Sequence, residues 1–287
     1  MSELEEMVMR STILLLMLAT PALSQVISGH ADLLCWQAGS ADFQNAYAIS
    51  ENLSAEPDRS VGFRAGVGYQ HCSHWKVSWT YTNFGADESR AWSGARNPGD
   101  SFSSYSDLDF QLHDFEVGRS FRLAEYLEVE AFGGFRWGQV DYSLSDRYQL
   151  APGSIFVMTD TQVVRANSCT DSYGVRLGGE ARCRLRGNLS LFGRGAVSGL
   201  ASTTRSNGTS NRGITMVPWD VTDNHENLVL DASTGLAWRY GQLEVAAGYE
   251  WSSWQNSIQS RRIRYTEQPD YEDLLLEGAF ARVAVSY

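Results

Sequence analysis

The sequence contains no apolar run long enough to cross a membrane as a helix, few prolines and a single lysine, Lys76. A helical span needs about 20 apolar residues, whereas the one strongly apolar run covers only residues 13–19. A protein built from several membrane helices is therefore excluded. Positive charge is scarce too, with 23 Lys+Arg against 34 Asp+Glu. Because phosphate contacts need a positive surface, the formal net charge of −11 argues against a nucleic-acid partner.

Glycine and aromatic residues are abundant, with 26 Gly, 9 Trp, 13 Tyr and 12 Phe among 287 residues. Hydrophobic residues make up 43% of the chain, which is enough to support burial rather than disorder. Many glycines and aromatics with few helix formers favour an all-β protein. The length is sufficient for one large closed barrel.

The first residues have the features of a secretory signal peptide, which we assign to residues 1–24. Arg10 precedes the apolar run, and the small residues Ala22 and Ser24 follow it at the spacing of a signal-peptidase site. Acidic residues ahead of Arg10 do not suit a positive leader, so we place the true start at Met9. The mature chain is then 25–287.

Apolar and polar residues alternate with period two over segments of about 9–14 residues, which is typical of half-buried strands. In residues 61–70 (VGFRAGVGYQ), for example, Val61, Phe63 and Tyr69 share one face and Arg64 lies on the other. We expect ten strands, near residues 31–49, 60–70, 74–84, 106–120, 125–146, 170–184, 188–203, 227–240, 242–256 and 271–287.

The connections between these strands alternate between short and long. Residues 71–73, 121–124, 185–187 and 241 are short, whereas 85–105, 147–169, 204–226 and 257–270 are long and polar. Short turns at one end and long loops at the other are the pattern of an outer-membrane β-barrel. We therefore predict an all-β fold, a closed antiparallel transmembrane β-barrel with short periplasmic turns and long extracellular loops, in a bacterial outer membrane.

Such a barrel faces lipid with apolar side chains and places aromatic residues where the hydrocarbon meets the headgroups. We expect aromatic belts, with outer-membrane lipid as their partner, formed by Trp75, Tyr81, Tyr126, Trp137, Trp238, Tyr240, Tyr249, Trp251 and Trp254. The chain ends on Tyr287 after hydrophobic residues at every second position. This ending resembles the signal read by the outer-membrane assembly machinery.

Several segments, in order, resemble the pore-forming major outer membrane protein family first named from Legionella. These are residues 31–36 (ADLLCW), 62–69 (GFRAGVGY), 79–82 (WTYT), 114–119 (DFEVGR), 133–137 (GGFRW) and 248–254 (GYEWSSW), together with the closing strand. The resemblance implies an outer-membrane protein that lets ions or small polar solutes cross. The departures are four cysteines, different loops and a terminal Tyr in place of Phe.

The polar parity of the predicted strands carries eight basic and eight acidic residues that would face the lumen. They are Arg64, Lys76, Asp114, Glu116, Glu128, Glu130, Arg136, Arg176, Glu180, Arg182, Arg194, Asp231, Arg239, Glu244, Glu250 and Arg282. Buried charges must be paired or wet. Two functions follow, a porin-like channel for ions or small polar solutes, and a plugged barrel with a structural or surface-interaction role through its loops.

Other chemistry has little support in the sequence. We find no G-x-S-x-G, H-E-x-x-H or phosphate-binding loop, so we expect no enzyme, no metal and no cofactor. An enzyme acting on lipid would need a serine beside His113, the one histidine well inside a strand. Cys35, Cys72 and Cys183 lie towards the short turns, so one disulfide among them fits an oxidising compartment. Cys169 lies towards the loops and is expected to be unpaired.

The signal-peptide assignment predicts that the mature protein begins at Gln25. Mass spectrometry of the amino-terminal peptide of the protein purified from membranes measures this directly. A protein that retains Met1 would contradict the assignment.

Overall fold

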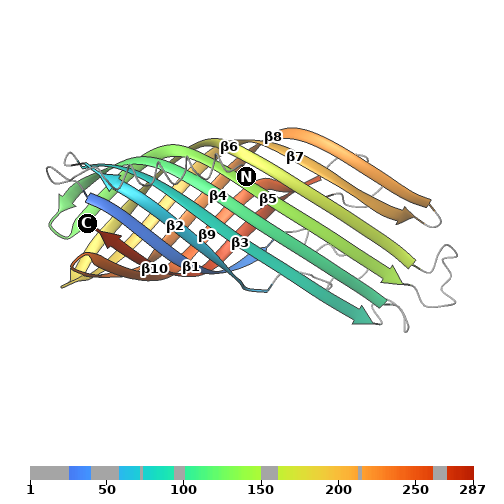
Figure 1. Ribbon diagram of the computed structural model, residues 1–287, viewed down its shortest axis with the longest axis horizontal. Coiled ribbons are helices and arrows are strands. Elements are labelled where there is room, and N and C mark those ends of the chain that lie inside the picture. The colour runs from blue at the N-terminus through green and yellow to red at the C-terminus, as the bar shows by residue number, and fades with distance from the viewer. Residues whose placement is uncertain are drawn as a thin grey trace, which may run out of the picture.

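The computed structural model describes residues 26–39, 58–71, 74–93, 101–149, 161–212, 215–260 and 270–287. Strands make up nearly all of these ranges (Figure 1). They are β1 (Val26–Gly39), β2 (Ser60–Gln70), β3 (Trp75–Ser93), β4 (Ser101–Ala124), β5 (Leu127–Gln149), β6 (Thr161–Arg186), β7 (Leu189–Arg212), β8 (Thr215–Tyr240), β9 (Leu243–Ser260) and β10 (Asp270–Ser286).

Each strand pairs antiparallel with its neighbours in sequence, and β1 pairs with β10 to close the barrel. Backbone bonds between Ile27 and Tyr287 complete this seam at the short-turn end. Two-residue turns join β4 to β5, β6 to β7 and β8 to β9. The predicted fold class is therefore confirmed.

In the described ranges, no helix has the length and apolarity needed to span a membrane.

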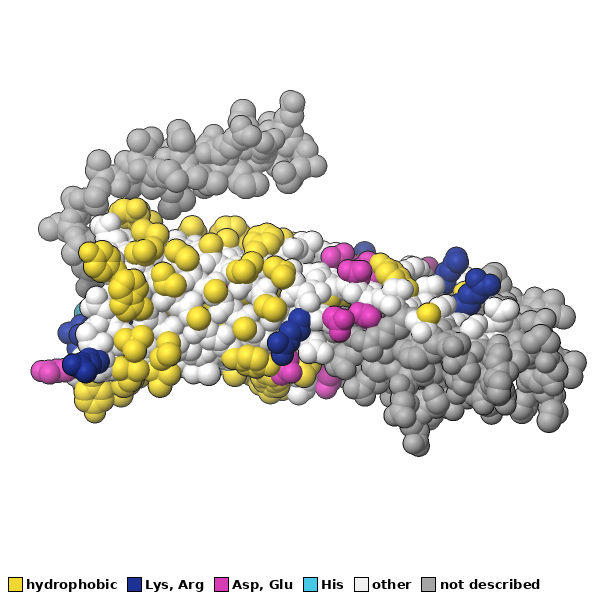
Figure 2. Space-filling model, turned by 90° about the horizontal axis from the view of Figure 1, so that it is seen from below, with side chains coloured by type: hydrophobic (Ala, Val, Ile, Leu, Met, Phe, Trp, Pro, Cys, Tyr) yellow, Lys and Arg dark blue, Asp and Glu magenta, His cyan; other side chains and the backbone are white. Residues whose placement is uncertain are grey.

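The half of the barrel next to the short turns is apolar outside and charged inside. On β4, for example, Phe115 and Val117 are about half exposed on the outer surface, whereas Glu116 between them is buried in the lumen. The same parity holds on the other strands. Figure 2 shows hydrophobic side chains covering this part of the surface. A surface of this kind matches the apolar band of an outer-membrane barrel.

Polarity inverts along the same strands beyond that apolar band. Further along β4, the inward positions are Leu112, Phe110 and Leu108, all buried, while Gln111 and Asp109 are exposed outside. On β5 the inward position Val140 is buried, while its outward neighbours are polar. This second half has the hydrophobic interior and charged exterior of a water-soluble protein. The level of the inversion marks the outer edge of the membrane.

Strands β3 to β8 continue well past this edge. The longest, β6 and β8, have 26 residues each, or roughly 60 Å along the barrel axis at the usual tilt, about twice the height of the apolar band. Much of the sequence that we expected to form the loops 85–105, 147–169, 204–226 and 257–270 is thus strand. Only residues 213–214 separate β7 from β8. Beyond the membrane edge the outward side chains become polar, while the backbone ladder continues.

The kind of side chain that lines the inside of this extension differs between one group of strands and another. Buried hydrophobic side chains come mainly from β1, β3, β4, β5, β9 and β10, whereas β6 and β7 contribute hydroxyl groups. Thr170 and Thr204 share a hydrogen bond of 2.7 Å across the two strands, as do Ser172 and Ser202. Cross-strand hydroxyl pairs of this kind let polar side chains be buried without loss of hydrogen bonds.

One carboxyl group in the extension has no cation beside it among the described residues. Asp146 on β5 is partly buried, and the Ser104 hydroxyl donates to its Oδ1 atom at 2.6 Å. Burial disfavours the charged form and raises the pKa of Asp146 from 3.8 to about 6.

This raised pKa predicts that the extension loses stability as pH rises. Between about pH 4 and 6 the folded state holds a proton that the unfolded chain has lost, so unfolding becomes easier by on the order of 2 kcal/mol. Asp146→Asn, which stays neutral, should be more stable than the parent at pH 7.5 and lose less stability than the parent between pH 4.5 and 7.5. Limited proteolysis in urea at pH 4.5 and 7.5 measures this. Asp109→Asn, an exposed carboxyl on the neighbouring strand, is the control, and equal pH profiles for parent and Asp146→Asn would contradict the prediction.

Candidate functional site in the lumen

A cavity of about 660 Å³ occupies the lumen at the short-turn end of the barrel. Turn residues Tyr126, Gly187 and Gly241 form its mouth, and Trp36, Phe110 and buried ion pairs form its floor. Every charge that we predicted to face the lumen lines this cavity. We call this space the vestibule. Because short turns face the periplasm in this class of barrel, it is open to that side.

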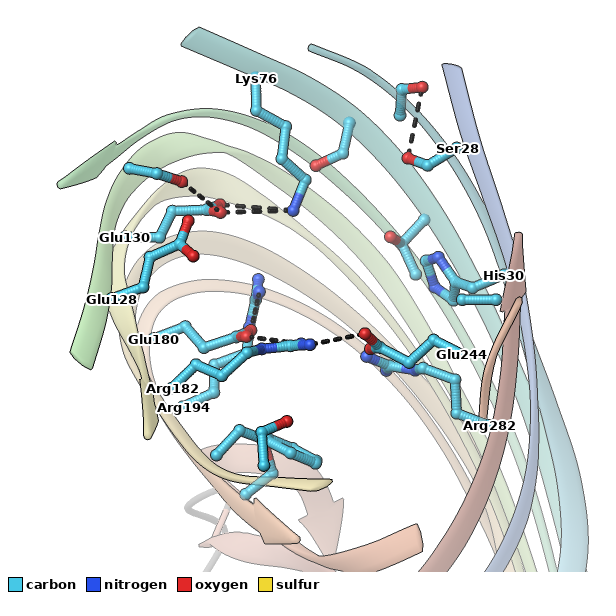
Figure 3. A pocket seen from close by; sticks show the side chains of 18 of the residues that line it. Ser28, His30, Lys76, Glu128, Glu130, Glu180, Arg182, Arg194, Glu244 and Arg282 are labelled. Carbon is cyan, nitrogen blue, oxygen red and sulfur yellow. Dashed lines mark hydrogen bonds and ion pairs between the residues drawn. The ribbon is translucent and has the colours of Figure 1, made fainter. Parts of the chain in front are cut away.

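The mouth of the vestibule is a loose mixture of charges (Figure 3). Arg182 pairs with Glu244 at 2.7 Å across the lumen and with Glu180 at 3.2 Å on its own strand. The contact between Lys76 Nζ and Glu130 Oε2 is longer, at 3.4 Å, and the Lys76 side chain is one-third exposed. Charges this accessible retain contact with water.

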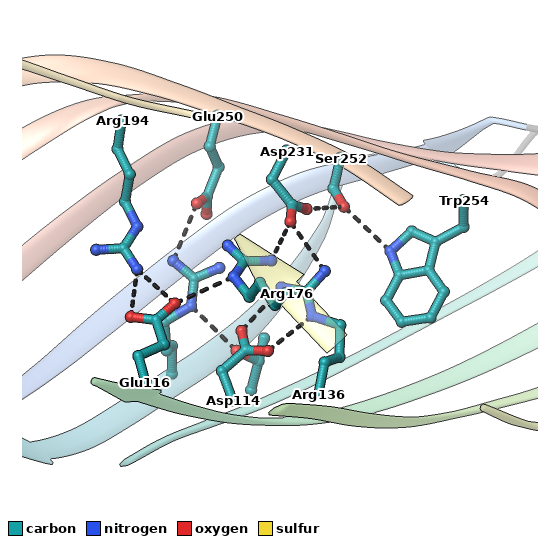
Figure 4. A network of polar contacts seen from close by, with 11 residues as sticks. Asp114, Glu116, Arg136, Arg176, Arg194, Asp231, Glu250, Ser252 and Trp254 are labelled. Carbon is teal, nitrogen blue, oxygen red and sulfur yellow. Dashed lines mark hydrogen bonds and ion pairs between the residues drawn. The ribbon is translucent and has the colours of Figure 1, made fainter. Parts of the chain in front are cut away.

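Deeper in the lumen the charges form a dense network (Figure 4). Arg136 makes a two-pronged contact with Asp114, through Nε at 2.7 Å and Nη2 at 2.8 Å, and its Nη1 atom donates to Asp231 at 2.8 Å. Arg176 also bonds Asp231, and reaches Glu116 at 3.1 Å. Arg136 and Arg176 are 1% and 4% exposed. Two-pronged guanidinium contacts are among the strongest in proteins, so this network fixes strands β4, β5, β6 and β8 together.

A second group of charges ties β1 and β2 to β9 and β10. Asp32 is buried and accepts two bonds from Arg282, at 2.8 and 2.7 Å. Arg64 donates to Glu250 at 2.9 Å, and the Trp36 indole donates to the other oxygen of Glu250 at 2.9 Å. The network therefore extends around the circumference and meets the aromatic floor.

Aromatic side chains from opposite walls meet above the ion pairs. Phe110 on β4 and Trp254 on β9 pack edge to face, with ring centroids 5.2 Å apart. These strands lie on opposite sides of the closed ring, so the contact spans the lumen. Trp254 also lies close to β5, where a Cβ atom on Gly138 would come within 2.8 Å of the indole. Phe110 and Trp254 are buried, so we call this pair the aromatic cross-brace.

Eight of the nine residues predicted for the aromatic belts lie on the outer face of the barrel. Trp75, Tyr126, Trp137, Trp238, Tyr240 and Tyr249 are exposed on the outer surface, and Tyr81 and Trp251 lie on the same face. The prediction for Trp254 is wrong, because its side chain is fully buried in the lumen. It is three residues from Trp251, so the two side chains point to opposite faces of the strand.

Sequence reasoning missed several lumen residues. Asp32, which pairs with two arginines, was not among the predicted charges. The sequence could have indicated it, because Asp32 lies between Ala31 and Leu33 and its side chain must point to the face opposite theirs. No signal pointed to the aromatic cross-brace, because contacts between non-adjacent strands depend on barrel diameter and stagger rather than on alternation.

The cysteine prediction also needs correction. Cys35, Cys169 and Cys183 are free thiols, so a disulfide between Cys35 and Cys183 is not formed. Their side chains share the outward parity, but Cys35 lies on β1 and Cys183 on β6, far apart around the ring. Cys72 and the signal peptide lie outside the described residues. Within the described ranges, His, Cys, Asp and Glu form no group placed to hold a metal ion.

Comparison with known proteins identifies the family. The family model described as Legionella pneumophila major outer membrane protein precursor matches residues 21–287, so the chain belongs to this family. No curated protein sequence matches the chain. The family and the barrel fold together place the protein in a bacterial outer membrane.

Two solved structures are similar to the chain at low sequence identity. The outer membrane protease OmpT from Escherichia coli is 9% identical, with a TM-score of 0.57, covering 94% of this chain and 99% of that one. A major outer membrane protein from Thermus thermophilus is 12% identical, with a TM-score of 0.38, covering 92% and 100%. The first of these likenesses shows the barrel fold alone.

The buried network predicts a large penalty for removing one of its charges. Asp231→Asn leaves Arg136 and Arg176 each short of a counter-charge, and we expect the free energy of unfolding to fall by about 3–5 kcal/mol. Urea titration of the refolded protein, followed by the heat-dependent gel shift, measures this. Asp220→Asn, at an exposed position of the same strand, should change stability by less than about 0.5 kcal/mol. A loss below about 1 kcal/mol for Asp231→Asn would contradict the role of the network.

Proposed function

We propose that this member of the Legionella major outer membrane protein family is a sealed barrel that acts at the cell surface through the extension of β3–β8. The observation that carries the proposal is the aromatic cross-brace, which joins opposite walls of the lumen where porins have water. Around it, Leu34, Phe84, Leu108, Leu274 and other inward side chains are almost completely buried. A barrel of about eight strands is just filled by its own side chains, and ten strands lie close to that limit.

The ion pairs below the cross-brace support the same proposal. An ion that crossed the lumen would have to pass beside Asp231 and the two arginines, Arg136 and Arg176, that bond it. Both arginines are almost completely buried. Breaking such pairs is costly because each group would be left buried and unpaired. The network is thus better suited to bracing the barrel than to selecting ions.

The extension supplies a surface for the proposed role. Six neighbouring strands project beyond the membrane as one continuous sheet. Its outer face carries acidic side chains at Asp87, Asp107 and Asp109, and Figure 2 shows charged groups gathered beyond the hydrophobic band. We propose a structural or surface-interaction role for it, and no enzymatic activity, because the likeness to a protease rests on fold alone.

A second candidate is the porin-like channel that the sequence predicts. The vestibule favours it, because a charged cavity of about 660 Å³ that is open to the periplasm would give solutes access to the lumen from that side. Conduction of ions or small polar solutes would then require Phe110 and Trp254 to move aside. The two candidates differ in whether the resting barrel conducts.

The sealed barrel predicts no steady conductance for the refolded mature chain in a planar bilayer. The double variant Phe110→Ala and Trp254→Ala removes both rings of the cross-brace, and we expect discrete conductance steps from it. Trp251→Ala, which removes an indole on the outer face of the same strand, is the control and should stay silent. Each preparation must first show the heat-dependent gel shift of a closed barrel.

Discrete conductance steps from the unmodified protein would contradict the sealed-barrel proposal and favour the channel. In that case, neutralising Arg136 and Arg176 together should shift the reversal potential in a salt gradient. A silent double variant that still folds would show that the cross-brace alone does not close the lumen.

A further inference from the structure

Arg119 is a cation on the outer surface of the membrane-spanning half. It lies on β4 between the outward side chains of Val117 and Phe121, and it is exposed. Inward arginines on nearby strands, such as Arg136 on β5 and Arg176 on β6, are paired with carboxylates. The ion pairs found among the described residues do not include Arg119. A charge on a lipid-facing surface is tolerated close to the membrane interface, where it can reach polar groups.

Two aromatic rings hold the Arg119 guanidinium in place. Its Cζ atom lies 5.7 Å from the ring centroid of Trp75, the residue directly opposite it on β3, and 5.4 Å from that of Phe121. Cation–π contacts of this kind orient the guanidinium but do not neutralise it. They leave the N–H groups, which form a planar fork, free to bind an anion.

The position of Arg119 along the barrel identifies the anion. Trp75 is the first residue of β3, and the backbone N–H of Ser120 donates to the carbonyl of His74 in the adjoining short turn. Trp75 also belongs to the aromatic belt near the short turns, at the periplasmic interface of the membrane. The anions at that depth are the phosphates of phospholipid headgroups, which match a guanidinium fork.

We propose that Arg119, Trp75 and Phe121 form a binding site for the headgroup phosphate of a phospholipid in the periplasmic leaflet. The guanidinium bonds the phosphate oxygens, while the two rings and Val117 contact the upper part of the acyl chains. This site is on the outside of the barrel, so it does not depend on whether the lumen is sealed.

Native mass spectrometry of the delipidated protein in detergent tests the site with dioleoylphosphatidylglycerol as the probe. We expect a tightly bound lipid on the parent protein and about a tenfold weaker affinity for Arg119→Gln, because a charge-assisted contact is lost. Arg119→Lys should fall between the two, since it keeps the charge but loses the fork. Arg205→Gln, which removes an exposed arginine from the extension, should bind like the parent.

Two further measurements separate the sources of phosphate and guard against misfolding. Inorganic phosphate at millimolar concentration should not displace the lipid, and dioleoylglycerol, which lacks the phosphate, should bind as weakly as the phospholipid binds to Arg119→Gln. Trp75→Leu keeps the cation but removes one ring, and should weaken binding while the gel shift of a closed barrel is retained. Equal lipid affinity for the parent and a folded Arg119→Gln would overturn the proposal, as would displacement by inorganic phosphate.

Discussion

A backbone amide or carbonyl in hydrocarbon has no water to bond, and the rest of this structure depends on that constraint. It requires that every strand have two partners, which β1 and β10 supply by pairing with each other. Closure in turn divides each strand into two faces, one towards lipid and one towards the lumen. Only apolar side chains are stable on the first, so the charges of the alternating sequence are directed to the second. Their pairing inside the barrel follows from closure.

The number of strands then determines what the lumen can contain. Ten strands give a ring narrow enough for side chains to meet across the lumen, as Arg182 and Glu244 do near the mouth. At the centre, Phe110 and Trp254 meet from opposite walls. Gly138 removes the side chain that would otherwise collide with the Trp254 indole. Among the described residues, the lumen is consequently lined by buried hydrophobic and hydroxyl side chains over its outer half and by the charged vestibule at the short-turn end.

Sequence reasoning recovered what alternation controls and missed what it does not. It placed the apolar strand segments and the parity of residues such as Phe63 and Arg64, because a lipid-facing strand must alternate. It mistook the outer halves of β3–β8 for loops, because the outward side chains there are polar and many inward ones on β6 and β7 are hydroxyls, so the segments resemble polar loops in sequence. It also placed Trp254 in a belt, where counting residues from Trp251 would have turned it inward. The pairings across the lumen were beyond its reach, because they depend on strand tilt and stagger.

The inversion of polarity at the membrane edge explains why such a barrel can extend so far into water. Within the membrane, an apolar side chain is about as stable against lipid as it would be in the lumen, so the hydrophobic effect does not favour an apolar lumen there. The charged side chains in that part of the lumen are stabilised by pairing instead. Beyond the edge, water is the alternative environment, so the hydrophobic effect favours an apolar interior. Leu108 and Phe110 fill that interior while Asp107 and Asp109 on the same strand face solvent. The side-chain pattern of one continuous strand therefore suits lipid in its first part and water in its second. The cross-brace lies close to the level at which the pattern changes.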